Sequence, residues 1–496
     1  MAKQYVMALD LGTTGNRAIL FNQAGDIVSQ AYKELTQYYP QPGWVEHDAI
    51  EIWQQVQWAI RTAIGEANID PSEIAAIGLT VQRETCLLWD KTTGKPLHKA
   101  IVWQDRRTAD MCATLAAHKT EIYERSGLFL DAYFSGTKLR WLLDKVQPDN
   151  LDNVLAGTID TWALWNLTDG KVHATDHSNA SRTLLMNLST QQWDDKLLDI
   201  FGVPRSLLAE IKPSQGMFGY TDPSLLGVEI PIAALLGDQQ AALFAHGCDR
   251  PGLLKCTYGT GAFLVAHTGK EIVRSKNQLL STIGWTTAKE DSNYDLGYAL
   301  EGSMFTAGAC IQWLRDGMQI IDSAADSEPL ATSVEDNGGV YFVPALSGLG
   351  APHWDMGARG AFLGITRGAT KAHMVRSVLE AIANQAREVV TAINDDSGTP
   401  ITTLKVDGGA CNNDFLMQYQ ADVLGIPVER PAVLDATAQG SAFAAGLAVG
   451  FWNDYTTLVN NRKIDKIFEP GPGKAVAQEN FETWQRAVER AQGWIV

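Results

Sequence analysis

The stretch VMALDLGTTGNRAILF, residues 6 to 21, reads as an apolar strand, a turn rich in Gly and Thr, and a second apolar strand. A second stretch of the same form, LLKCTYGTGAFLVAHT, covers residues 253 to 268. Thr13 in the first turn and Thr260 in the second lie about half the length of the 496-residue chain apart. A repeat over that distance predicts two similar domains.

Apolar strand-like segments alternate with amphipathic helical segments along the rest of the chain, a pattern typical of an α/β protein. A chain of 496 residues is also too long for one compact core. The turn residues Asp-Arg-Pro-Gly stand at positions 249 to 252, just before the second strand–turn–strand stretch. We therefore predict one domain over residues 1–247 and a second over residues 248–496.

Two helices are clearly marked in the sequence. One is expected to begin at Asp48, which can cap it, with Glu51 placed three residues later as in a capping box. The other is expected from about Lys371 to Ile393, with apolar residues at helical spacing. Both patterns are typical of ordinary core helices.

Composition excludes some classes of function. The chain has 40 Lys and Arg against 57 Asp and Glu, a net charge of −17, which opposes binding to nucleic acid. The N-terminal residues show no signal-peptide pattern, and no apolar run reaches the roughly 18 residues of a membrane-spanning helix. Six cysteines without a C-x-x-C pair suit reduced thiols. We expect a cytoplasmic protein without membrane insertion.

Three polar residues follow an apolar run in the segment LTVQRETCLLWD, residues 79 to 90. Gln82, Arg83 and Glu84 stand where a buried strand should end, and apolar residues resume at Leu87. A surface turn would account for them. A binding site at the end of the strand is the alternative.

The Gly/Thr-rich turns have a use beyond reversing the chain. Glycine lets the backbone approach a ligand closely, and backbone N–H groups with Thr hydroxyls offer donors to phosphate oxygens. Two such turns could clamp the phosphates of a nucleotide, although plain hairpins would look the same. Asp10 ends the first strand just before its turn, where a carboxylate would repel phosphate unless a divalent cation stood between them.

The segment LKVDGGACNNDFLMQ, from residue 404, reads as a strand, a Gly408-Gly409 turn and a helix capped by Asn412 or Asn413. A glycine turn before a helix N-terminus is a natural seat for a nucleoside. The chain has no G-x-x-x-x-G-K-[ST] motif and no complete dinucleotide fingerprint. If the protein uses ATP, it binds it with neither a P-loop nor a Rossmann fold.

Together, DLGTT (10–14), YGTG (258–261) and DGG (407–409) resemble the ATPase fold shared by actin, hexokinase and the large heat-shock chaperones. The motifs GDQQ (237–240), QRET (82–85) and PALSGLGAPHWDMGARGAFLGITRG (344–368) narrow the resemblance to the FGGY carbohydrate kinases, over nearly the whole chain. The resemblance implies two similar actin-like, ribonuclease H-like ATPase domains with a cleft between them. It also implies phosphoryl transfer from ATP to a small polyol.

Within the family the chain is most similar to members that phosphorylate glycerol, and this implies a polyol site. Arg83 and Glu84 would hydrogen-bond the hydroxyls, and a paired guanidinium and carboxylate can both donate to and accept from a hydroxyl. The other polyol contacts implied by the resemblance are Tyr133, Asp238 and Gln239, with Trp103 and Phe263 along the carbon edge. Plain core packing is the alternative for each of these two aromatic residues.

For the chemistry, the resemblance implies that Asp238 accepts the proton of a terminal hydroxyl while that oxygen attacks the γ-phosphorus of Mg-ATP in line, giving sn-glycerol 3-phosphate. Most of the rate would come from positioning and charge stabilisation. Asp10 would face Mg²⁺. The implied phosphate donors are Thr13, Thr14, Arg17, Thr260 and Gly308, and the implied nucleoside contacts are Gln312, Gly409 and Asn413. An arginine in a hairpin, such as Arg17, is also often the partner of a carboxylate.

The sequence departs from the family pattern in two places. Leu11 and Gly15 stand where many glycerol-phosphorylating members have Gln and Ser, which removes two polar side chains near the phosphates. The segment 222–231 contains no Lys or Arg, so it could not supply the charge with which some bacterial relatives bind an anionic effector. The Ala- and Gly-rich helix at 436–452 is expected to pack close to neighbouring backbone, beside the nucleotide site.

Two alternatives to a glycerol-phosphorylating enzyme stay open. One is a kinase of the same family for a pentulose or another small polyol. The other is a nucleotide-gated binding protein of the actin or chaperone kind, which would have no need of the GDQQ and QRET motifs. The resemblance further implies a homo-oligomer, either a dimer or a tetramer.

Overall fold

Two compact units make up the chain in the computed structural model, which describes residues 3–290 and 293–495. Unit 1 consists of Met1–Gly247, Ser281–Tyr298 and Thr437–Asn461, and unit 2 of Cys248–Leu280, Ala299–Ala436 and Arg462–Val496. The first break falls after Gly247. Two later segments return to unit 1, so that unit is assembled from three stretches of chain.

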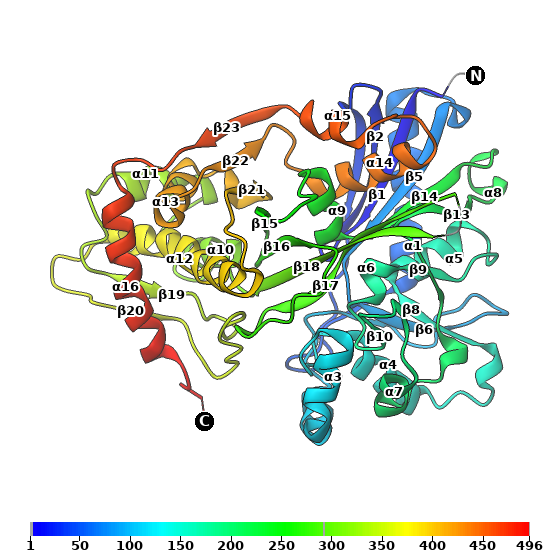
Figure 1. The fold of residues 1–496 in the computed structure, drawn as a ribbon, viewed down its shortest axis with the longest axis horizontal. Helices are drawn as coiled ribbons and strands as arrows, with labels where there is room; N and C mark the ends of the chain where they lie inside the picture. Colours follow the sequence, from blue (N-terminus) through cyan, green and yellow to red (C-terminus); the bar gives the residue numbers. More distant parts are fainter. Residues whose placement is uncertain (1–2, 291–292, 496) are drawn as a thin grey trace. The chain divides into compact units, whose positions relative to one another are not determined.

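The main sheet of unit 1 combines parallel and antiparallel pairs (Figure 1). Strand β1 pairs antiparallel with β2 and parallel with β5, and β5 pairs parallel with β14. In order across the sheet, the strands are β17 (Leu280–Ala288), β13 (Gln215–Tyr220), β14 (Pro231–Gly237), β5 (Ile74–Val81), β1 (Tyr5–Leu11), β2 (Gly15–Asn22) and β3 (Ile27–Glu34). A smaller sheet holds β4 (Glu46–His47), β7 (Ala100–Ile101), β6 (Cys86–Asp90) and β8 (Val154–Thr158).

Helices cover both faces of this sheet, because successive side chains of a strand point to opposite sides. Met7 and Leu9 of β1 share a buried cluster with α1 (Ala49–Ala67) and α5 (Ile159–Leu167). Val6 and Ala8, the alternate residues, pack with α9 (Asp238–Ala245) and α14 (Ala436–Ala448). A strand covered on both faces is uniformly apolar, as the sequence of β1 is up to Asp10.

The start of α1 confirms the predicted cap at Asp48, but not the capping box with Glu51. The Asp48 carboxylate accepts hydrogen bonds from the backbone N–H groups of Ile50 and Glu51. Glu51 does not turn back to complete a capping box. Its Oε1 accepts from the backbone N–H and the hydroxyl of Thr36 instead, at 3.1 and 2.9 Å. The second predicted helix is α12, which runs from Lys371 to Ser397.

Helix α14 packs against neighbouring backbone as closely as its Ala- and Gly-rich sequence predicted. A Cβ added to Gly440 would clash with the carbonyl of Ala241 on α9. A Cβ added to Gly78 on β5 would clash with the carbonyl of Ser441 on α14. Both clashes would be with main-chain atoms, so glycine is required on each side of this contact.

Unit 2 repeats the plan of unit 1. Strand β15 pairs antiparallel with β16 through a short turn and parallel with β21. The strands in order are β23 (Ile464–Phe468), β22 (Val428–Pro431), β21 (Thr403–Asp407), β15 (Leu253–Tyr258), β16 (Ala262–Gly269) and β18 (Tyr294–Met304). Its core combines β15 with α10 (Gly308–Asp316), α12, α13 (Asp414–Leu424) and α16 (Lys474–Ala491). The α/β fold class with two similar domains is confirmed.

Within residues 3–290 and 293–495, no helix combines the length and the apolar character needed to cross a bilayer.

Candidate functional site

Three parallel strands of unit 1 end at the same edge of the sheet. Leu11 at the end of β1 pairs with Val81 at the end of β5, and Val81 also pairs with Gly237 at the end of β14. The Gly12–Thr14 turn, the Gln82–Glu84 segment and Asp238 therefore leave one edge together. This explains the polar run after β5, because the carboxyl ends of parallel strands are where α/β proteins place their sites.

Arg83 is held in a buried position behind this edge. Its Nε lies 3.2 Å from Oδ1 of Asp238, and its Nη1 donates to Oε1 of Gln240 at 3.2 Å. The side chain of Arg83 is 2 % exposed and that of Asp238 is 27 % exposed. The carboxylate is therefore partly open to solvent, while the guanidinium paired with it is buried. Gly237 makes room for this arrangement, since a Cβ there would lie 2.7 Å from Cδ of Arg83.

Glu84 is also buried and paired. Nε of Arg182 donates to its Oε1 at 2.7 Å, and neither side chain is more than 2 % exposed. The guanidinium of Arg182 also lies 5.7 Å from the ring centroid of Tyr133. Burial of a lone carboxylate would be costly, and the ion pair offsets part of that cost.

Trp103, predicted along the carbon edge of the polyol, lies next to Tyr133, predicted to hydrogen-bond it. Their rings meet edge to face with centroids 5.6 Å apart. Nε1 of Trp103 donates to the hydroxyl of Thr13 at 2.8 Å, and its backbone N–H donates to the hydroxyl of Thr85 at 3.1 Å. Trp103 thus touches both the Gly/Thr-rich turn and the QRET segment. Gln239, next to Asp238, is buried, and its backbone N–H donates to Oδ1 of Asp238 at 2.7 Å.

A second connection between the two segments runs through His47. Gln82 Nε2 donates to the carbonyl of Gly12 at 3.2 Å and lies 3.2 Å from Nδ1 of His47. Nε2 of His47 lies 2.8 Å from Oε1 of Gln37, whose Nε2 donates to the carbonyl of Thr13 at 2.9 Å. Burial lowers the pKa of His47 to about 4. The neutral imidazole must therefore accept at Nδ1 and donate from Nε2, which fixes its tautomer.

Asp10, the predicted metal-facing residue, is almost completely buried. Its Oδ2 lies 3.3 Å from Nε of Arg17 and accepts a hydrogen bond from the hydroxyl of Thr437 at 3.1 Å. Arg17 thus lies beside a carboxylate, as a hairpin arginine often does. Among the described residues no group of three or more His, Cys, Asp or Glu side chains could hold a metal ion.

In unit 2, the turn after β15 abuts the start of α10. The backbone N–H groups of Gly308 and Ala309 donate to the carbonyls of Gly259 and Thr260, both at 3.0 Å. The side chain of Thr260 is exposed, as is that of Thr14 in the corresponding turn of unit 1. The two repeated turns therefore both present a free face with a threonine on it. Phe263, two residues into β16, is half-buried.

The remaining predicted nucleoside contacts of unit 2 are Gln312, Gly409 and Asn413. Gln312 lies exposed on α10. A Cβ on Gly409 would meet nothing within 4 Å, so the space above this glycine is open. Asn413 caps α13 by accepting from the backbone N–H of Leu416 at 2.8 Å, and its Nδ2 donates to the hydroxyl of Ser327 at 3.2 Å. The capping role predicted from the sequence is confirmed for Asn413.

Two family models match the chain, and together they span most of it. The N-terminal domain of the FGGY family of carbohydrate kinases matches residues 5–245, and the C-terminal domain of the same family matches residues 254–449. The chain belongs to the FGGY family of carbohydrate kinases.

This FGGY kinase is similar over its whole length to proteins named glycerol kinase. It is 72 % identical to the one from Acaryochloris marina and 69 % identical to the one from Trichormus variabilis, with 99 % of each chain covered in both cases. Its structure is similar to that of the Plasmodium falciparum glycerol kinase with ADP, with a TM-score of 0.91 and 34 % identity. That match covers 99 % of this chain and 98 % of the other.

Some residues of the FGGY kinase site carry no signal in the local sequence. Gln240 belongs to the GDQQ motif, but no partner was predicted for it, and Arg182 was not singled out at all. Gln37 and His47, which connect the two site segments, were likewise overlooked. Each contacts a residue far away in the sequence, such as Arg182 with Glu84 at a separation of 98 residues, and no local pattern marks such pairs.

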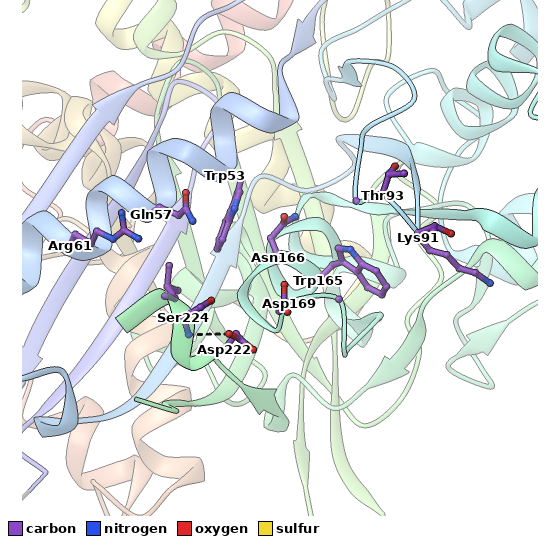
Figure 2. Close-up of a pocket in the computed structure, with 14 residues that line it drawn as sticks. Trp53, Gln57, Arg61, Lys91, Thr93, Trp165, Asn166, Asp169, Asp222 and Ser224 are labelled. Atoms are coloured by element: carbon purple, nitrogen blue, oxygen red, sulfur yellow. Dashed lines mark hydrogen bonds between the residues drawn. The ribbon is translucent and has the colours of Figure 1, made fainter. Parts of the chain in front are cut away.

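A separate surface pocket of about 420 Å³ lies in unit 1 of the FGGY kinase (Figure 2). It is lined by the indoles of Trp53 and Trp165 and by polar side chains that include Gln57 and Asn166. Asp222 also lines it and accepts a hydrogen bond from the backbone N–H of Ser224 at 3.0 Å. None of the residues predicted to bind polyol or nucleotide lines this pocket.

Proposed function

We propose that this chain is a glycerol kinase, which transfers the γ-phosphoryl group of ATP to glycerol and forms sn-glycerol 3-phosphate and ADP. The observation that carries the proposal is the ion pair between Arg83 and Asp238 beside the buried Glu84–Arg182 pair. The high identity to proteins named glycerol kinase supports it independently. The pentulose alternative has less support, because the xylulose kinases share the fold at only about a fifth of identical positions.

Recognition of the polyol would rest on complementary charges. The Arg83 guanidinium can only donate and the Glu84 carboxylate can only accept, so together they satisfy both halves of a hydroxyl. Because both are buried and already paired, they are held in place before the polyol binds. Tyr133, Gln239 and Asp238 would complete the hydrogen bonds, and Trp103 and Phe263 would cover the carbon chain.

Phosphoryl transfer would use Asp238 as the general base. Oδ1 of Asp238 contacts Arg83 at 3.2 Å and the backbone N–H of Gln239 at 2.7 Å, which fixes the orientation of the carboxylate. The proton of a terminal hydroxyl passes to Asp238 as its oxygen forms a bond to the γ-phosphorus, and the bond to the β-phosphate oxygen breaks to release ADP. The first turn of α9 carries Asp238, where the helix dipole stabilises a carboxylate.

The nucleotide would be held by residues from the repeated turns. Thr13, Thr14 and Thr260 offer hydroxyl donors to the phosphates, and Arg17 offers a guanidinium. Gly308, whose backbone N–H already donates to the carbonyl of Gly259, would keep the turn after β15 in place. The open face above Gly409, together with Gln312 and Asn413, suits the nucleoside.

A Mg²⁺ ion would accompany ATP at Asp10. One buried carboxylate is a sufficient protein ligand, because Mg²⁺ is usually held by one or two carboxylates with water and substrate phosphates. When bound, the ion neutralises phosphate charge. Asp10 is stabilised in its absence by Arg17 and Thr437, both of which could turn toward phosphate.

The setting of the enzyme is part of the proposal. All six cysteines are free thiols, which fits the reducing cytoplasm.

A dimer or tetramer is expected from the resemblance. The net charge of −17 opposes a nucleic-acid partner. Exposed apolar residues on β3 and α1, such as Tyr32 at 50 % and Ile50 at 48 % exposure, are suited to contact between copies. Analytical ultracentrifugation gives the stoichiometry directly.

Product analysis tests the proposed reaction. The protein is incubated with Mg-ATP and glycerol, and ³¹P NMR follows the phosphorus. We expect a phosphate monoester that sn-glycerol-3-phosphate dehydrogenase oxidises completely. A product that this enzyme leaves untouched, or hydrolysis to inorganic phosphate alone, would contradict the proposal.

A further inference from the structure

Lys138 is a fully buried lysine on α4 (Ser135–Val146). Its Nζ donates to the backbone carbonyl of Tyr133 at 2.6 Å and to that of Glu84 at 3.4 Å. Among residues 3–290 and 293–495, no carboxylate lies within ion-pair distance of this Nζ, so the two carbonyls are its principal partners. Burial lowers the pKa of Lys138, as expected for an ammonium removed from water.

The carbonyl of Glu84 receives a second donor from the same helix. The hydroxyl of Ser135 donates to it at 3.0 Å. Ser135 and Lys138 are three residues apart on α4, so they lie on the same side of the helix and point at one acceptor. Helix α4 therefore holds the Glu84 carbonyl through two side chains.

Glu84 needs such support, because its backbone has a φ of 61°, in the left-handed region. A non-glycine residue adopts this conformation at a cost, and it persists only where the surroundings enforce it. The conformation decides where the side chain goes. With the carbonyl turned toward Ser135 and Lys138, the Glu84 carboxylate is directed toward Arg182 and Arg83.

We propose that Lys138 is a positioning residue for the polyol: together with Ser135 it holds Glu84 in the left-handed conformation and ties the Tyr133 segment to the same point. The inference rests on the proposed function, in which Glu84 and Tyr133 bind the polyol. One ammonium with three donors can link two carbonyls that are 49 residues apart in the sequence. Lys138 itself does not contact the substrate.

The test compares Lys138→Met with two other variants. Methionine keeps the length and apolar stem of lysine but removes all donors. Lys145→Met is the matched control, because Lys145 is an exposed lysine in the last turn of the same helix. Glu84→Gln tests the underlying polyol site. For each variant we measure kcat, the KM for glycerol, the KM for ATP and the thermal midpoint.

We expect Lys138→Met to raise the KM for glycerol about tenfold or more, as for loss of a buried charged hydrogen bond, with the KM for ATP within about twofold. Lys145→Met should change neither. Loss of thermal stability with an unaltered KM for glycerol would reduce Lys138 to a structural role and overturn the inference. If Glu84→Gln raises the KM for glycerol while Lys138→Met does not, the proposed function stands and only this inference falls. An unaltered KM in Glu84→Gln would refute the polyol site itself.

If Lys138→Met does not fold, Ser135→Ala tests whether α4 positions Glu84. It removes one of the two donors to the Glu84 carbonyl and leaves the buried charge in place. We expect it to raise the KM for glycerol about threefold or more without changing the KM for ATP. A KM for glycerol identical to that of the unaltered protein would contradict the inference.

Discussion

Nε of Arg83 lies 3.2 Å from Oδ1 of Asp238, so an ion pair joins the end of β5 to the first turn of α9. The two strands that carry these residues, β5 and β14, are parallel neighbours that end in register. The guanidinium is buried while the carboxylate is partly exposed. The sheet thus presents an oriented carboxylate next to the segment proposed to bind the polyol, which is the arrangement that a general base requires.

Asp238→Asn should abolish most turnover and leave ATP binding intact. The amide cannot take the proton of the attacking hydroxyl, so we expect kcat to fall by about 10² to 10⁴. Titration with a fluorescent ATP analogue should give a dissociation constant within about threefold of that of the unaltered protein. Loss of nucleotide affinity in parallel with activity would show that Asp238 is structural.

Gly237→Ala should weaken glycerol binding. The added Cβ would lie 2.7 Å from Cδ and 2.8 Å from Cγ of Arg83 and 2.9 Å from Oε1 of Gln240, and a buried arginine has little freedom to move away. We expect a rise of about tenfold in the KM for glycerol and a small change in the KM for ATP. Gly65→Ala is the control, since its Cβ would meet nothing within 4 Å on α1. Equal effects of the two substitutions would argue against the steric explanation.

Gly408→Ala should destabilise unit 2. Gly408 has a φ of 87°, and an added Cβ would contact the backbone of Tyr258, lying 3.0 Å from its nitrogen. Strain and overlap of this kind cost roughly 1–3 kcal/mol of folding free energy. Gly409→Ala, one residue later, has open space and should fold with unchanged stability. Urea unfolding of both variants tests this, and similar midpoints would show that the Gly408 conformation carries no special constraint.

Asp10→Asn should raise the Mg²⁺ concentration needed for activity. Loss of the carboxylate removes the only protein ligand proposed for the ion, so we expect half-maximal activity to require at least about tenfold more Mg²⁺. Thr437→Val removes only a hydrogen bond to Asp10 and should shift that requirement less. An Mg²⁺ titration curve that is identical in Asp10→Asn and the unaltered protein would remove Asp10 from the metal site.

Stability should fall as the pH is lowered from about 6.5 toward 4. Burial lowers the pKa of His47, His173, His177 and His267 to about 4, against 6.5 in the unfolded chain. The unfolded state binds more protons in this range, so the stabilisation present above pH 6.5 is lost as the pH falls through the folded pKa. For each histidine, a pKa difference of one between the folded and unfolded states corresponds to roughly 1.4 kcal/mol of folding free energy.

Buried carboxyls with a raised pKa work in the opposite direction, namely Asp160, Asp176 and Glu380, and so does His353, whose pKa Glu388 raises. Burial raises the pKa of Asp160 to about 6, so its contribution is present at low pH and is lost as the pH rises through 6. The four histidines, together with carboxylates whose pKa is lowered, such as Asp48, Asp194 and Asp414, should leave a net loss of folding free energy toward acid. His47→Gln should reduce the slope of unfolding free energy against pH between 6.5 and 4. A flat profile for the unaltered protein would contradict the assignment of neutral buried histidines.

The local parts of the fold could be predicted from the sequence. Periodicity and turn residues located the β1–β2 and β15–β16 hairpins, and Asp48 and Asn413 were correctly predicted to cap helices. The polar run that begins at Gln82 correctly indicated the end of a strand, and the burial of Gln82, Arg83 and Glu84 excludes a surface turn. These features depend on a few neighbouring residues, so a single sequence carries them.

The long-range parts could not be predicted. The pairs Arg182–Glu84, Lys138–Glu84 and Arg83–Gln240 join residues 98, 54 and 157 positions apart. They depend on which strands become neighbours in the sheet, and local propensity does not specify that order. The return of residues 281–298 and 437–461 to unit 1 is likewise a consequence of sheet order.

The most direct test of the central claim is ADP release with Mg-ATP, followed with a coupled assay in the presence of glycerol, dihydroxyacetone, xylulose, ribulose or no acceptor. We predict turnover with glycerol well above that with any other acceptor, because Arg83, Glu84 and Asp238 are proposed to bind a small polyol together. Turnover on a pentulose alone would support kinase activity but refute the proposed glycerol site. Turnover that is absent, or independent of acceptor, would contradict the account as a whole.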